Sequence, residues 1–123
     1  MSERKMFSKN VSEPWFSLIK CQLKKTEGRL LKGDFLNMNI GDYITWTNQE
    51  LGFPRSCTTI ITSILHYNSF KDYINSEGLD KCLPGIDNLE EGLSVYYSYF
   101  TPGQEKNLGV IAIRLKKSDI NSN

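Results

Sequence analysis

The sequence predicts one α+β domain, built on a small, curled and mainly antiparallel β-sheet with flanking helices. The 123 residues are enough for one hydrophobic core but not for two. Apolar and turn-forming residues mark about four strands and three helices along the chain. The helices interrupt the strands without alternating regularly with them, which favours such a sheet over a doubly wound parallel one.

The first part of the chain is expected to hold one helix and one strand. We expect a folded domain over residues 11–117, with flexible polar segments at 1–10 and 118–123. The first helix is predicted to begin near Ser12, which can cap it, with Pro14 in the first turn. A charged stretch from Lys24 onward then leads into the first strand.

Three further strands and two further helices follow. Runs rich in β-branched and aromatic residues predict strands at 43–47, 57–65 and 109–115. Ser69 and Asp72 form a capping pattern for a second helix, which Gly78 can end. A similar pattern at Asp87 predicts a third helix, which is expected to stop at Pro102.

Composition limits the classes of partner. Fifteen Lys and Arg face fourteen Asp and Glu, so any nucleic acid must be bound by a local patch and not by a global field. No apolar run approaches the roughly 20 residues of a membrane helix, and residues 1–10 lack the apolar core of a secretory signal. We therefore expect an intracellular, cytoplasmic protein that does not enter a membrane.

The cysteines and the histidine give no sign of a metal or another cofactor. Cys21, Cys57 and Cys82 are far apart, which is typical of free thiols and not of a disulfide framework or a zinc site. Cys57 is expected to be a buried strand thiol and not a nucleophile, because no base accompanies it. His66 is the single histidine and has no Cys or carboxylate at ligand spacing.

The ordered set of segments resembles the ASCH family over nearly the whole chain. Residues 24–30 read Lys-Lys-Thr-Glu-Gly-Arg-Leu, similar to the family's Lys-Thr-x-Glu-x-Arg-Leu type of signature. Gly-Asp at 41–42 precedes a strand, and Arg55 precedes a β-rich run. A Phe-containing helix then leads to Leu-Pro-Gly at 83–85, and the sequence Gly-Val-Ile-Ala-Ile at 109–113 is similar to the family's last strand.

The resemblance implies a PUA-like β-barrel, a cleft beside the signature and a role in RNA metabolism. One bacterial branch of the family looks like a minimal amidohydrolase that removes the acetyl group from N(4)-acetylcytidine. This sequence departs from the pattern at Gln22, where a Gly is common, and at Lys25, where a Thr is usual. It also has Glu27 where the amidohydrolases place a catalytic Thr, while Glu77 occupies a position comparable to their catalytic Glu.

These residues predict a charged pocket for RNA or for a modified nucleoside. Lysine and arginine can hold phosphates or polar base edges, a glutamate can accept hydrogen bonds, and an aromatic ring can stack on a base. The predicted binding residues are Lys24, Lys25, Glu27, Arg29, Trp46 and Arg55. Phe53, Tyr96, Tyr97 and Tyr99 are further candidates for stacking.

Two other functions stay open at this point. One is an amidohydrolase acting on N(4)-acetylcytidine, with Lys24, Glu27 and Glu77 as catalytic residues. In that case Lys24 must first lose its proton, which desolvation and a neighbouring cation would favour. The other is a protein-interaction module whose charged cleft grips a peptide. The sequence makes no prediction of the oligomeric state.

Overall fold

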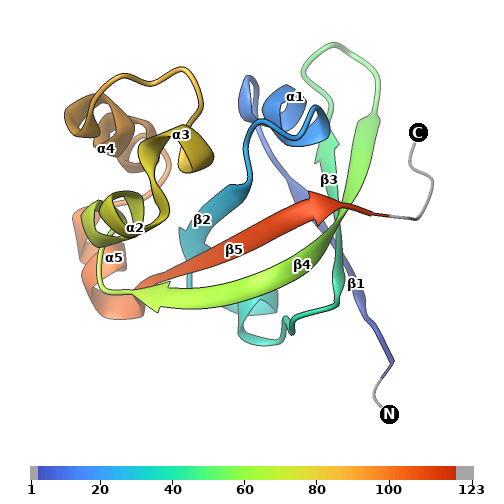
Figure 1. The fold of residues 1–123 in the computed structure, drawn as a ribbon, viewed down its shortest axis with the longest axis horizontal. Helices are drawn as coiled ribbons and strands as arrows, with labels where there is room; N and C mark the ends of the chain where they lie inside the picture. The colour runs from blue at the N-terminus through green and yellow to red at the C-terminus, as the bar shows by residue number, and fades with distance from the viewer. Residues whose placement is uncertain (1–2, 119–123) are drawn as a thin grey trace.

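Five strands form a single mixed sheet in a computed structural model, which describes residues 3–118. Their bounds are β1 (Met6–Asn10), β2 (Thr26–Leu30), β3 (Tyr43–Asn48), β4 (Arg55–Tyr67) and β5 (Val110–Lys117). The strand order is β1-β3-β4-β5-β2, with β1 parallel to β3 and the other pairs antiparallel. The sheet curls into a half-barrel (Figure 1), so the expected α+β class and the curled sheet are confirmed.

The edge strand β1 corrects the prediction that residues 1–10 are flexible. Met6–Asn10 pair in register with β3, from Met6 opposite Tyr43 to Asn10 opposite Thr47. The segment alternates between exposed and half-buried residues, which is typical of a strand that covers only an edge. The mostly polar composition of this segment is the reason why the sequence did not predict a strand there. Of the expected C-terminal flexible segment, residues 119–123 lie outside the part of the chain that the structure describes.

Most of the helices gather at one end of the sheet, apart from the first helix (Figure 1). The helix α1 (Trp15–Lys20) lies near β3, and the short 3-10 helix η1 (Gly33–Leu36) follows β2. On the other side lie α2 (Phe70–Glu77), α3 (Leu79–Cys82), α4 (Leu89–Tyr97) and α5 (Pro102–Leu108). The predicted cap of α2 is confirmed, because Ser69 accepts a hydrogen bond from the Asp72 amide and Gly78 follows the helix at φ 99°.

Three helix ends differ from the prediction. At α1 the N-cap position is Pro14 and not Ser12, and the Glu13 carboxylate accepts from the backbone N–H and the hydroxyl of Ser17. At α4 the cap is Asn88, one residue after the expected Asp87. Pro102 does not merely stop a helix. It begins α5, because proline needs no amide donor in a first turn.

A column of aromatic rings packs α2 against α4 and the residues that follow α4. The ring of Phe70, at the start of α2, stacks on Tyr96 of α4 with centroids 4.6 Å apart. Phe70 also stacks on Phe100, with centroids 5.5 Å apart. The buried Glu105 of α5 accepts hydrogen bonds from the Phe70 amide and from the Tyr97 hydroxyl, which fixes the start of α2. The chain between α4 and α5 is thereby held against β2.

Candidate functional site

A cavity of about 320 Å³ lies beside β2 and is bounded by α1 and by the C-terminal part of α4. We call it the main cavity. Its charged lining comes from Lys24, Glu27 and Arg29, so the structure brings together three of the predicted site residues. Its apolar and aromatic lining includes Trp15, Tyr96 and Phe100.

Glu27 is the buried carboxylate of the main cavity. It is 5% exposed and stands on β2, between Thr26 and Gly28. Its Oε1 accepts from Lys24 Nζ at 3.2 Å and from the Gly28 amide at 3.2 Å. Its Oε2 accepts from Arg29 Nε at 3.0 Å. A carboxylate offers about four lone-pair positions, so three neighbouring donors leave room for one more.

The charge of Glu27 is set by two opposing effects. Burial alone would raise the pKa of the Glu27 carboxyl, because it disfavours the charged form. The positive charges of Lys24 and Arg29, and their hydrogen bonds, outweigh burial and lower the pKa below its ordinary value of 4.5. Glu27 is therefore an ionised hydrogen-bond acceptor at neutral pH.

Lys24 has all three of its ammonium hydrogens in use. Its side chain is 1% exposed, and Nζ donates to the carbonyl oxygen of Thr26 at 2.8 Å and to that of Cys82. The third partner is the Glu27 carboxylate. All three partners are pure acceptors, so only the protonated amine satisfies them. In this geometry Lys24 is a fixed positive charge behind Glu27.

Gln22 adopts an unusual backbone conformation in the turn before Lys24. Gln22 is a non-glycine residue in the left-handed region, at φ 68°. The turn carries the chain from α1 back toward β2, and the Leu18 carbonyl accepts from the amides of both Leu23 and Lys24. Glycine adopts this conformation without steric cost, whereas a residue with a Cβ, such as Gln22, does so at some cost.

Arg29 links the main cavity to the sheet. Its Nε is bound to Glu27, and Nη2 donates to the carbonyl oxygen of Asn10 at 2.8 Å. The guanidinium lies over the rings of Trp46 and Phe35, with centroid distances of 5.6 and 5.8 Å. Three of its five N–H donors have no partner in residues 3–118, so Arg29 can still bind a ligand.

Glu77 belongs to a separate cluster on the other face of β2. Thr26 precedes Glu27, its side chain points the opposite way, and its hydroxyl lies 3.5 Å from Glu77 Oε1. Arg114 holds Glu77 at 2.8 and 3.0 Å, and the Tyr67 hydroxyl donates at 2.6 Å. The hydrogen bonds from Arg114 lower the pKa of the Glu77 carboxyl despite burial. Glu77 does not line the main cavity, so it is not grouped with Lys24 and Glu27 as expected.

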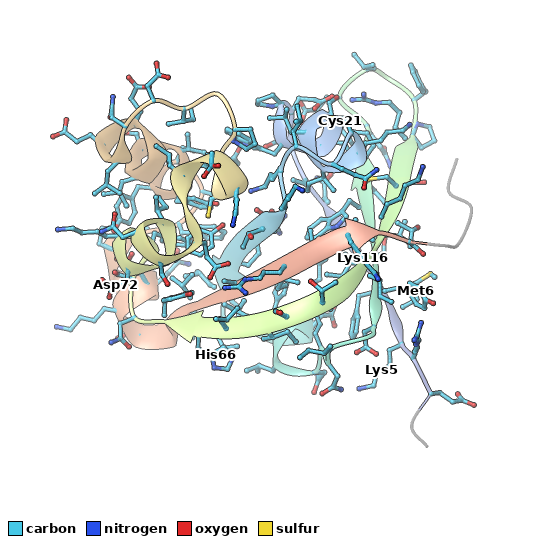
Figure 2. All side chains as sticks on the ribbon, viewed as in Figure 1. Lys5, Met6, Cys21, His66, Asp72 and Lys116 are labelled. Carbon is cyan, nitrogen blue, oxygen red and sulfur yellow. The ribbon has the colours of Figure 1, made fainter. Side chains whose placement is uncertain are left out.

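Three predicted binding residues lie elsewhere. Trp46 is fully buried and donates its indole N–H to Thr59, so it supports Arg29 and cannot stack on a ligand. Arg55 is bound to Glu13 and Asn48 and does not line the main cavity. Lys25 lines a separate hollow of about 70 Å³ together with Lys116, which Figure 2 labels on β5.

The thiols and the histidine do not contribute to the main cavity. Burial raises the pKa of the Cys57 and Cys82 thiols to about 11, so neither is a thiolate at neutral pH. His66, labelled in Figure 2 near the end of β4, does not line it. Residues 3–118 contain no group of three His, Cys, Asp or Glu side chains arranged to hold a metal ion.

No described helix has the length and hydropathy needed to cross a bilayer. The longest helix, α4, has nine residues.

Two solved structures share this fold over nearly the whole chain. The crystal structure of the hypothetical protein PH0355 is 30% identical with a TM-score of 0.82, and the match covers 92% of this chain and 99% of that one. The solution NMR structure of protein PF0455 from Pyrococcus furiosus is 32% identical with a TM-score of 0.74, covering 94% and 99%. This chain belongs to the same family as these two proteins. No protein-family model and no curated protein matches it.

Sequence reasoning missed several residues of the main cavity. Phe100, which follows α4, lines the cavity but was not among the predicted site residues. Ser12 was assigned to a helix cap, yet its hydroxyl is hydrogen-bonded to the Tyr99 hydroxyl, and both residues line the cavity. Asn10 contributes from the end of β1, which was not predicted as a strand. Residues 6–10 read Met-Phe-Ser-Lys-Asn, which does not alternate between polar and apolar side chains, so the sequence offered no strand signal there.

Proposed function

We propose that this chain is an ASCH-type domain of PUA-like architecture that binds a nucleobase in the main cavity, either in RNA or as a modified nucleoside. The observation that carries the proposal is the pairing of Glu27 with Arg29. An ionised, buried acceptor lies 3.0 Å from a guanidinium that still has free donors, and aromatic side chains surround both.

The unused hydrogen-bond donors and acceptors of the main cavity define the kind of ligand edge that it can bind. Glu27 can accept one more hydrogen bond, and Arg29 can donate up to three. The ligand should therefore present a donor beside an acceptor. Nucleobases carry this arrangement on their Watson–Crick edges, which proteins read in unpaired RNA. A purely anionic ligand would be repelled by the charge of Glu27. A purely cationic ligand would be repelled by Lys24 and Arg29.

The size and walls of the main cavity also suit one nucleoside. Small-molecule sites commonly have volumes of about 300–1,000 Å³, and the 320 Å³ here is at the lower end of that range. Tyr99 is 54% exposed and lines the main cavity, so it is the side chain best placed to stack on an entering base. Base stacking on an aromatic ring contributes roughly 1–3 kcal/mol.

Two observations weigh against the amidohydrolase alternative. Lys24 donates to three acceptors, so a neutral amine, with two hydrogens, would leave one of them unsatisfied. Glu77 lies in the cluster with Arg114 and not in the main cavity. The peptide-binding alternative gains no support from a cavity of this size.

The test is a calorimetric titration of the protein with the four ribonucleosides and with N(4)-acetylcytidine, repeated with Glu27→Gln. We expect binding that Glu27→Gln weakens by about tenfold or more, because a charged acceptor is lost. The mixtures are then analysed by chromatography for cytidine. Binding of N(4)-acetylcytidine without product fits the proposal. Release of cytidine would establish the amidohydrolase, and no binding of any nucleoside would refute the proposal.

A further inference from the structure

A second hollow adjoins the main cavity on the far side of Arg29. It has a volume of about 290 Å³ and shares two residues, Arg29 and Phe100, with the main cavity. We call it the basic groove, and its other principal lining residues are Lys9, Lys32 and Phe35. Three cationic side chains and no carboxylate line it, whereas the main cavity contains Glu27.

The cations of the basic groove differ in how far they are already neutralised. Lys32 is exposed and has no ion pair or hydrogen bond from its side chain within residues 3–118. Lys9 Nζ lies 2.9 Å from Asp34 Oδ2 and 5.0 Å from the centre of the Phe35 ring. Asp34 is therefore an internal anion that holds Lys9 at the edge of the groove, while Lys32 has no such partner.

We propose that the ligand is a nucleotide, with its base in the main cavity and a phosphate in the basic groove on Arg29, Lys32 and Lys9. This inference rests on the proposed function. A phosphate needs several converging donors, which the basic groove supplies with no carboxylate in its lining, whereas the main cavity contains Glu27. Arg29 borders both hollows and has three free donors, so it can contact both parts of one ligand.

The role of Asp34 makes the inference specific. A bound phosphate would compete with Asp34 for Lys9, since both anions need the same ammonium group. Removing the Asp34 charge should therefore strengthen phosphate binding, while removing the Lys32 charge should weaken it. If the lysines of the basic groove only increased solubility, removing the Asp34 or the Lys32 charge would not change the affinity for a ligand in the main cavity.

The experiment compares each ribonucleoside with its 5′- and 3′-monophosphates by calorimetry. For the base that binds, we expect one monophosphate to bind about tenfold more tightly than the nucleoside. Lys32→Ala should remove most of this gain without changing nucleoside affinity, and Asp34→Asn should increase it. Lys71→Ala is the matched control, because Lys71 is an exposed lysine on α2 that lines neither hollow.

The outcomes separate this inference from the proposed function. If nucleosides bind but phosphates add nothing, or if Lys32→Ala weakens nucleoside and nucleotide equally, the phosphate site is refuted and the base site stands. If neither class binds, both proposals fall. A five-nucleotide single-stranded RNA identifies the source of the phosphate. Tighter binding than the mononucleotide, with a salt dependence that Lys32→Ala reduces, supports an RNA strand, and a gain confined to the mononucleotide supports a free nucleotide.

Discussion

Lys24 Nζ and Glu27 Oε1 form a buried ion pair, 3.2 Å apart, in the wall of the main cavity. The side chains are 1% and 7% exposed. Lys24 precedes β2 and Glu27 lies within it, so the pair fixes the chain where it enters the strand. The stability of this end of the fold and the charge of the candidate site therefore depend on the same contact.

Breaking this pair from one side should destabilise the protein strongly. Lys24→Met leaves Glu27 buried with only Arg29 to compensate it, and we expect a loss of about 3–5 kcal/mol in the free energy of unfolding. The double variant Lys24→Met/Glu27→Leu should lose less, because no uncompensated charge remains. Urea denaturation measures both. A loss under about 1 kcal/mol for Lys24→Met would show that the pair is not a structural element.

Acid should weaken the fold through several carboxylates, among them Glu77 and Glu27. Hydrogen bonds from Arg114 lower the pKa of Glu77, and Lys24 with Arg29 lowers that of Glu27 against the effect of burial. Both folded-state values lie below the ordinary 4.5, so the stabilisation is complete above that pH and is lost as the pH falls through the folded-state values. We expect the free energy of unfolding to fall on acidification below about pH 4.5.

The variant Glu77→Gln tests the source of that pH dependence. In this variant the free energy of unfolding should fall less steeply on acidification (the acid limb of the curve of stability against pH), because the side chain at position 77 no longer titrates. Urea denaturation between about pH 3 and 7 measures the effect, with wild type alongside. An acid limb that is unchanged in slope would show that Glu77 has the same affinity for protons in the folded and unfolded states.

Gly28 should not tolerate a side chain. A Cβ there would lie 2.6 Å from the ring of Tyr73, which is itself fully buried. Gly28→Ala should cost about 1–3 kcal/mol through overpacking. Gly103→Ala in α5 is the control, because its nearest neighbour is 3.9 Å away and alanine favours a helix. Thermal denaturation of both variants gives the comparison, and equal melting temperatures would contradict the predicted close contact.

Two equally exposed aromatic residues should differ in their effect on ligand binding. Tyr99 and Phe53 are each 54% exposed, but only Tyr99 lines the main cavity. Tyr99→Ala should weaken nucleoside binding by about 1–3 kcal/mol if it stacks on the base. Phe53→Ala should leave affinity unchanged. Calorimetric titration distinguishes them, and an effect of Phe53→Ala alone would move the binding surface to the β3–β4 hairpin.

The three interior strands and the edge strand β2 were predicted from the sequence, but the other edge strand, β1, was not. The β-branched run around Tyr43 and the alternation after Gly109 both mark strands that the structure contains. Met6–Asn10 is a strand because β3 offers an edge to pair with, while its own sequence does not alternate between polar and apolar residues. Pairing with a distant segment therefore determines that residues 6–10 form a strand, which their local β-propensity does not predict.

The centre of the site was also predictable, whereas its boundary was not. Lys24, Glu27 and Arg29 are close in sequence, so β2 and the residues just before it bring them to one cavity. Trp46 and Glu77 looked equally suitable by residue type. Their positions depend on burial and on the face of β2 that each residue contacts, neither of which spacing reveals.

The central claim is that the main cavity binds a nucleobase through Glu27 and Arg29. The most direct measurement is a titration of ¹⁵N-labelled protein with the ribonucleosides, followed by amide chemical shifts in two-dimensional NMR. We predict saturable shifts centred on Gly28, whose amide donates to Glu27, and on Arg29, with Glu27→Gln needing about tenfold more nucleoside to reach saturation. Saturable shifts confined to other surfaces, or none at millimolar nucleoside, would contradict the account.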